Sequence, residues 1–158
     1  MAMDASANSV KGAQSTANSG SLAATRGRDS WESLSDSHES LPRVAASDSE
    51  LAADLMPFTA LADAPMAMTA HVIYEAWDAE HCASVSATVI QERIRQHIGF
   101  DGLLISDDLD MKALSGGIPA RAEAVLSAGC DIALNCWGRL DDMRGIAEQV
   151  PPLSLIHI

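Results

Sequence analysis

Two short apolar segments, each introduced by the same pattern, constrain the fold of this 158-residue chain more than any other feature. Gly-Phe-Asp at 99–101 precedes "GLLIS" (102–106), and Gly-Cys-Asp at 129–131 precedes "DIALN" (131–135) thirty positions later. About thirty residues is the length of one β-α unit. Consecutive apolar residues are typical of a parallel strand that helices cover on both faces. The repeat therefore predicts an α/β fold with a parallel sheet.

Two helices and one strand are predicted before the first apolar segment. The first helix begins with an N-cap serine or aspartate at 47–48, and Pro57 is expected to end or kink it. The second helix, "SATVIQERIRQHIG", has isoleucines on one face, a capping box starting at Thr88, and Gly99 as its stop. Between the two helices, the apolar run "MAMTAHVIY" (66–74) predicts a strand.

Two further helices follow. Pro119 is expected as the first helical residue of one, with Gly129 as its stop, and "RLDDMRGIAEQV" (139–150) forms the other. The apolar stripe of this last helix consists of Leu140, Met143 and Ile146. Three β-α units are thus visible, whereas a closed eight-unit barrel needs about 250 residues. If the fold is a barrel, most of it is absent from this sequence.

The two ends of the sequence differ in character from its middle. Residues 1–35 are rich in Ser, Ala, Gly and Asn without apolar periodicity, and we expect them to be disordered or non-native. The ending "PPLSLIHI" (151–158) continues no helical or strand pattern and is expected to be an unstructured tail. This division leaves residues 36–150 as the folded domain.

The composition narrows the classes of partner. The chain has 22 Asp and Glu residues but only 10 Lys and Arg, which gives a net charge of -12. This charge argues against nucleic acid or an anionic membrane as a binding partner and favours a neutral substrate such as a sugar. The sequence has neither a membrane-length apolar run nor a signal-peptide pattern at its start, so a cytoplasmic location is expected. Cys82, Cys130 and Cys136 lack metal-ligand spacing and are interpreted as reduced structural thiols.

Three aspartates, Asp107, Asp108 and Asp110, directly follow the "GLLIS" strand. Reacting groups in α/β folds lie at this end of parallel strands. Adjacent carboxylates repel one another unless they cap backbone N–H groups, bind a cation or face a developing positive charge. Spacing alone leaves these roles open: Asp108 or Asp110 caps a following helix, Asp107 acts in chemistry or is a solvated loop residue, or all three hold magnesium for phosphoryl transfer. No Gly-rich phosphate loop supports the magnesium alternative.

Histidines supply two further candidates. Asp36 and His38 are separated by one residue, so both side chains could project to one side of an extended loop, as an oriented acid/base pair or as a plain polar loop. His71, at the end of "MAMTAH", is either a substrate contact at the same strand edge or a buried histidine with a satisfied hydrogen bond.

Five blocks in this order resemble a known enzyme family: "DSHESLPRV", "DLMPFTAL", "APMAMTAHVIY", "GFDGLLISDDLDMKAL" and "RAEAVLSAGCDIALNC". They are similar to the cytoplasmic β-N-acetylhexosaminidases of glycoside hydrolase family 3. The resemblance runs from Asp36 to Gln149, and "GFDGLLISDDLDM" is its most specific portion.

The resemblance implies a (β/α)8 TIM barrel, of which this chain holds only the second half. It also implies a retaining glycosidase that removes terminal N-acetylglucosamine from peptidoglycan-derived muropeptides during cell-wall recycling, without a metal or organic cofactor. Asp107 matches the family's nucleophile, and Asp36 with His38 matches its acid/base dyad. His71 is carried over only as a weak substrate-binding candidate.

The sequence departs from the family pattern upstream. The family's Lys-His-x-Pro-Gly-His-Gly segment, which supplies substrate contacts, has no counterpart in "NSGSLAATRGRDSWES". Half a barrel also leaves an open sheet edge, so we expect a poorly stable chain or self-association through that edge. An inactive barrel fragment is therefore the alternative to an active glycosidase.

Overall fold

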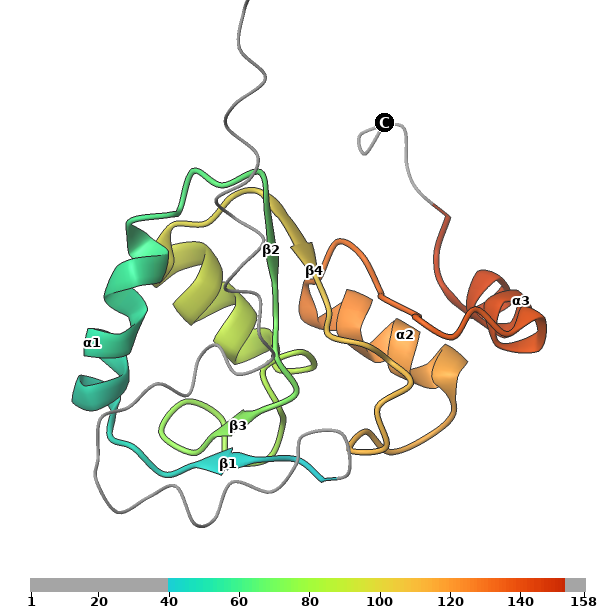
Figure 1. The fold of residues 1–158 in the computed structure, drawn as a ribbon, viewed down its shortest axis with the longest axis horizontal. Helices are drawn as coiled ribbons and strands as arrows, with labels where there is room; N and C mark the ends of the chain where they lie inside the picture. Colours follow the sequence, from blue (N-terminus) through green and yellow to red (C-terminus); the bar gives the residue numbers. More distant parts are fainter. Residues whose placement is uncertain (1–39, 153–158) are drawn as a thin grey trace, which may run out of the picture.

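The computed structural model describes residues 40–152. The elements are β1 (Arg43–Val44), α1 (Asp48–Thr59), β2 (Met66–Met68), β3 (Ile73–Tyr74), the π-helix η2 (Val89–Ile98), β4 (Leu103–Ile105), α2 (Ile118–Ala128) and α3 (Leu140–Gln149). In Figure 1, β2 and β4 run side by side through the middle, with α1 on one side and α2 and α3 on the other. This arrangement confirms the predicted α/β class.

All strand pairs are parallel, as the repeat predicted. β1 pairs with β3, and β2 pairs with β4 in a register that sets Met66 opposite Leu103 and Met68 opposite Ile105. The backbone N–H of Thr69 also donates to the carbonyl of Ile105 at 2.9 Å. The carboxyl ends of β2 and β4 therefore meet at one edge of the sheet.

The predicted strand 66–74 is wrong as a single element, because the chain forms two short strands there. β2 and β3 lie in different two-stranded sheets, and of the four residues between them only Thr69 still bonds to the backbone of β4. Two of these four, Thr69 and His71, are buried polar residues whose side chains bond to Ser84. Side-chain bonding thus replaces the ladder at this point.

The predicted strand 131–135 is also wrong as a regular strand. It makes a single parallel bridge, between Ile105 and Ile132. Two residues after Ile132, the N–H of Leu134 donates to the side-chain oxygen of Ser106 at 3.0 Å instead of to a backbone carbonyl. The segment nevertheless lies beside β4, as the repeat predicted.

The helices confirm the predicted stops, but four predicted details differ in the structure. Gly99 and Gly129 end η2 and α2 in the left-handed conformation. However, α1 continues past Pro57 to its own end, because a proline in the last turn removes only one helical hydrogen bond. Thr88 is the N-cap of η2 as predicted, but its side chain makes no capping bond. The N–H of Val89 donates instead to Oγ of Ser86 at 3.1 Å.

Two further corrections concern α2 and α3. Pro119 was predicted as the first helical residue of α2, but the helix begins one residue earlier, at Ile118. In the predicted stripe of α3, only Ile146 packs against the core, while Leu140 and Met143 are 61% and 52% exposed. The helix exists as predicted, but most of its apolar stripe lies outside the described core.

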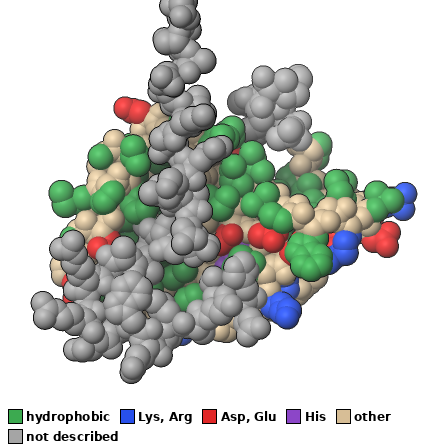
Figure 2. All heavy atoms as spheres, in the orientation of Figure 1, with side chains coloured by type: hydrophobic (Ala, Val, Ile, Leu, Met, Phe, Trp, Pro, Cys, Tyr) green, Lys and Arg blue, Asp and Glu red, His purple; other side chains and the backbone are tan. Residues whose placement is uncertain are grey.

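The main core lies on the helical side of the β2–β4 sheet. It includes Leu104, Ile90 and Val125, each at most 1% exposed. The other sheet face is not covered by the described residues, so the prediction of a "GLLIS" strand buried on both faces is wrong for them. The exposed side chains there are Met66, Met68, Leu103 and Ile132. Figure 2 shows apolar side chains over β2 and β4 with acidic side chains beside them.

None of the described helices has the length and apolar character needed to cross a membrane.

Replacing Gly102 by serine tests the packing at the start of β4. A Cβ at Gly102 would lie 2.6 Å from the carbonyl oxygen of Ala64 and 2.8 Å from that of Pro65. Because these are backbone atoms, we expect Gly102→Ser to lower the free energy of unfolding by about 1–3 kcal/mol in urea denaturation.

Gly117→Ser is the matched control. Gly117 is the N-cap of α2, and its nearest neighbour to an added Cβ lies at 3.9 Å. Serine is favoured at an N-cap, so stability should be unchanged or raised. Equal losses in both variants would contradict the close approach at Gly102.

Candidate active site

Asp107 lies at the edge where β2 and β4 end and is half-buried. Its Oδ1 accepts a hydrogen bond from the N–H of Asp108 at 2.8 Å, and within residues 40–152 its Oδ2 has no hydrogen-bond partner. The preceding Ser106 is fully buried and donates its hydroxyl to the carbonyl of Asp107 at 2.8 Å. One carboxylate oxygen is therefore anchored, and the other is left available.

Asp108 and Asp110 hold the loop to the segment 136–139. Oδ1 of Asp108 accepts from the N–H groups of Asp110 and Cys136, both at 3.1 Å. Oδ1 of Asp110 forms an ion pair with Arg139 at 2.7 Å, and its side chain is only 3% exposed. The prediction that Asp108 or Asp110 caps a following helix is wrong, because the next helix begins at Ile118 with Gly117 as its N-cap. Their carboxylates instead bind N–H groups of loops and Arg139.

The magnesium alternative finds no support among the described residues. Within 40–152, no three His, Cys, Asp or Glu side chains are grouped so that they could hold a metal ion. The carboxylates of Asp108 and Asp110 are already engaged with backbone N–H groups and with Arg139.

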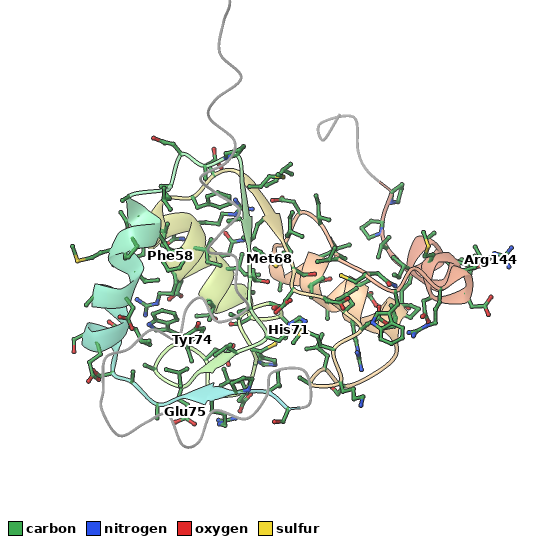
Figure 3. All side chains as sticks on the ribbon, viewed as in Figure 1. Phe58, Met68, His71, Tyr74, Glu75 and Arg144 are labelled. Carbon is green, nitrogen blue, oxygen red and sulfur yellow. The ribbon has the colours of Figure 1, made fainter. Side chains whose placement is uncertain are left out.

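His71 is 1% exposed and contacts the protein through both ring nitrogens. Nε2 lies 3.0 Å from the carbonyl oxygen of Asp108, and Nδ1 lies 2.8 Å from Oγ of Ser84. A carbonyl only accepts, so Nε2 carries the proton. Figure 3 labels His71 at the centre of the molecule, beyond the end of β2. Of the two roles weighed for it, His71 has that of a buried, hydrogen-bonded histidine; a substrate contact stays a prediction.

Burial is the main influence on the pKa of His71 and lowers it. The bond to the backbone of Asp108 and the negative charges of Asp107 and Asp108 oppose this shift, while the positive charge of Arg121 adds to it. The pKa of His71 is therefore below its ordinary value of 6.5, and the neutral ring is favoured.

Arg121, on the first turns of α2, holds the rest of the loop after β4. Its guanidinium donates to five backbone carbonyls, those of Leu109, Met111, Leu114, Ser115 and Gly116. The bonds to Leu109 and Met111 measure 2.6 and 3.0 Å. A planar group with five N–H donors suits several carbonyls at once. The role of Arg121 was not predictable from the sequence, because an arginine on a helix carries no local signal of such contacts.

Other predicted residues have simpler outcomes. Asp36 and His38 lie outside the described residues, so their dyad stays a prediction. All three cysteines are free, as predicted. Cys82 and Cys130 are buried, and burial raises the pKa of the Cys130 thiol to about 11, whereas Cys136 is exposed.

Replacing Arg121 by lysine tests the anchoring of the loop. A lysine keeps the charge but cannot reach five carbonyls, so we expect Arg121→Lys to destabilise the chain by about 1–3 kcal/mol. Hydrogen exchange should accelerate across residues 109–116. Arg144→Lys is the control, since Arg144 is exposed on α3 (Figure 3). Equal protection of the loop in both variants would contradict this role for Arg121.

The lowered pKa of His71 predicts a pH-dependent stability. The unfolded chain binds a proton on this histidine more readily than the folded chain does, so the contribution of His71 is fully present above about pH 6.5. That contribution is lost as the pH falls through the lower, folded pKa. Urea denaturation between pH 5 and 8 should show a smaller slope for His71→Gln than for the wild type. His97→Gln, at an exposed site, should keep the wild-type slope.

The chain matches known proteins over most of its length. Residues 8–157 match the family model described as "Glycosyl hydrolase family 3 N terminal domain". This match begins inside the segment 1–35 that the sequence analysis set apart, and the domain boundaries stay predictions. A beta-hexosaminidase of Thiobacillus denitrificans is 44% identical over 108 residues, 65% of this chain and 30% of that relative.

A second relative and two solved structures agree with this match. The beta-hexosaminidase of Tolumonas auensis is 44% identical over 126 residues, 75% of this chain and 37% of the relative. NagZ from Neisseria gonorrhoeae, solved with N-trifluoroacetyl-D-glucosamine, has a TM-score of 0.64 at 38% identity, covering 77% of this chain and 36% of that one. A glycoside hydrolase family 3 beta-N-acetylglucosaminidase from Paenibacillus has a TM-score of 0.66 at 31% identity, covering 73% and 23%.

The chain thus spans about a third of the length of these curated relatives. Its predicted resemblance is confirmed by both the family model and the relatives, and the chain belongs to glycoside hydrolase family 3.

Proposed function

We propose that this chain carries the nucleophile of a retaining β-N-acetylhexosaminidase, with Asp107 in that role. The main support for this role is the asymmetry of the Asp107 carboxylate. Its Oδ1 accepts a hydrogen bond from the N–H of Asp108, and its Oδ2 has no hydrogen-bond partner within residues 40–152. A nucleophile needs one free oxygen held at a constant angle. The position of Asp107 at the carboxyl end of a parallel strand, where α/β enzymes place reacting groups, supports the same assignment.

We further propose that the described residues belong to the second half of a (β/α)8 barrel. In support, β2, β4 and the segment bridged at Ile132 are parallel, and a helix lies between each pair along the chain. The exposed apolar face of this sheet is the face that the remaining strands of a barrel would cover. Figure 2 shows that face with the acidic side chains beside it.

The proposed reaction divides the work between Asp107 and the Asp36–His38 dyad. Asp107 attacks the anomeric carbon as the bond to the leaving oxygen breaks, and that oxygen takes a proton from His38. Water, deprotonated by the same histidine, then displaces Asp107 and releases the sugar with retained configuration. The negative charge of Asp107 also stabilises the positive charge that develops on the sugar ring.

The substrate we propose is a terminal, non-reducing N-acetylglucosamine on peptidoglycan-derived muropeptides, in cell-wall recycling in the cytoplasm. The relatives' name beta-hexosaminidase and the acetylated sugar analogue in the gonococcal structure support the sugar class. The excess of acidic residues argues against nucleic acid and anionic membranes as partners. The mechanism needs no metal or organic cofactor.

A specific observation favours the alternative, an inactive barrel fragment. Four large apolar side chains on the β2–β4 face are between 39% and 57% exposed in the described part of the chain. Such a face promotes association with other chains, including copies of itself. In this alternative Asp107 keeps its geometry, but the sugar has no complete binding site.

Hydrolysis of a chromogenic N-acetyl-β-glucosaminide by the purified chain tests the proposal. Asp107→Asn keeps the shape of the side chain and removes its charge, so we expect at least about a 1,000-fold loss of kcat. Asp101→Asn is the matched control, because Asp101 is exposed before β4, and its activity should equal that of the wild type.

A slow fluorinated substrate adds a direct identification of the nucleophile. The sugar should remain covalently attached, and peptide mass spectrometry should locate it on Asp107. Absence of turnover in a chain with folded circular dichroism would contradict activity and favour the fragment, while a label on another residue would contradict the assignment.

A further inference from the structure

A continuous series of hydrogen bonds joins the end of β2 to the carboxylate of Asp107. Oγ1 of Thr69 donates to Oγ of Ser84 at 3.1 Å, and Oγ of Ser84 lies 2.8 Å from Nδ1 of His71. Nε2 of His71 donates to the carbonyl of Asp108 at 3.0 Å. The N–H of Asp108 in turn donates to Oδ1 of Asp107 at 2.8 Å. The backbone of one residue, Asp108, thus receives from the histidine and orients the neighbouring carboxylate.

The donors and acceptors in this series allow one direction only. The carbonyl of Asp108 accepts, so Nε2 of His71 must carry a proton. The hydroxyl oxygen of Ser84 accepts a hydrogen bond from Thr69, and its own proton is donated to the unprotonated Nδ1. Burial favours the neutral ring of His71, and in that form these partners fix the Nε2–H tautomer.

The location of these groups argues against a purely stabilising role. Thr69, Ser84 and His71 are 4%, 0% and 1% exposed, so removing one partner leaves another buried polar group unsatisfied. Apolar side chains of similar shape would stabilise the core about as well without that risk. A polar series at this depth instead fixes geometry, and the group at its end is Asp107.

We propose that His71 is a positioning residue for Asp107, acting through the backbone of Asp108. This inference rests on the proposed function of Asp107 as nucleophile. By holding the carbonyl of Asp108, His71 restrains the residue whose own N–H binds Oδ1, through the Cα that joins its two peptide units, and so leaves Oδ2 directed for attack.

Three variants separate the parts of this proposal. In His71→Asn the amide reaches the position of Nδ1 but not that of Nε2, so the bond to Asp108 is lost. In His71→Gln the longer side chain brings an N–H donor to the position of Nε2. Ser84→Ala keeps the histidine and removes the hydroxyl that sets its tautomer.

Nuclear magnetic resonance of the whole 158-residue chain provides readouts that need no activity. Nitrogen-15 spectra of the wild-type ring should show a single neutral Nε2–H tautomer at pH 7, and Ser84→Ala should lose this single state. The amide resonance of Asp108 should shift as Asp107 ionises. This shift should vanish in Asp107→Asn and in His71→Asn, and return in His71→Gln.

These outcomes decide the proposal. Two wild-type results would overturn it, an Nδ1–H tautomer or a charged ring at pH 7. It would also be overturned if the amide resonance of Asp108 still shifted with the ionisation of Asp107 in a folded His71→Asn variant. If the role of His71 were merely structural, its replacement would lower stability and leave the pH-dependent shift of the Asp108 amide resonance unchanged. If His71→Asn does not fold, the wild-type tautomer and its loss in Ser84→Ala still decide between support and rejection.

Kinetics separate this proposal from the function on which it rests. With an active chain, His71→Asn should lower kcat roughly 100-fold with little change in KM, and His71→Gln should recover most of the loss. If neither His71→Asn nor His71→Gln lowered kcat, the proposal would also be overturned. Absence of wild-type turnover would instead reject the proposed function of this chain, and the spectra alone would then test the role of His71.

Discussion

The parallel pairing of β2 with β4 is the constraint on which the candidate site depends. Met68 lies opposite Ile105, and the next bond, from the N–H of Thr69 to the carbonyl of Ile105, keeps the two segments together where the strands end. The residues that follow the strands are therefore neighbours, although His71 and Asp108 are 37 positions apart in sequence. A shift of the register by one residue would move the polar side chains to the other face of the sheet.

A second interaction holds the next segment in place. One carboxylate oxygen of Asp131 accepts from the N–H of Leu104 at 2.7 Å and from the guanidinium of Arg95 at 2.8 Å. Arg95 also donates to the carbonyls of Phe100 and Gly102, which lead into β4. Asp131 thus replaces part of a backbone ladder, so the segment lies beside β4 although only one regular bridge forms.

These contacts show which parts of the fold the sequence could predict. The Gly-x-Asp pattern predicted two β-α units of the right length, because Gly99 and Gly129 both end helices by a local conformational preference. It could not show that Arg95 binds Asp131, whereas Asp101 has no hydrogen-bond partner within residues 40–152. Likewise, the apolar run at 66–74 gave no sign that its middle turns away from the sheet.

The site divides in the same way. The aspartates after β4 were predictable because they are adjacent in sequence and follow a recognisable strand. Ser84 and Arg121 were not, because their importance lies in partners that the fold brings near, and neither stands in a local motif. The pattern also could not choose between the two roles of His71, since a buried and an exposed histidine have the same sequence signature.

The anchoring of Asp107 is separate from the apolar face that the described residues leave open. Ser84 is fully buried and Arg121 lies on α2, both on the covered side, whereas Met66 and Leu103 project from the opposite face. Covering that face would contribute about 1.5–3 kcal/mol for each apolar side chain that became fully buried. It would do so without changing any hydrogen bond that orients the carboxylate. Stability thus depends on what covers the open face, while the direction of the Asp107 carboxylate depends on residues already described.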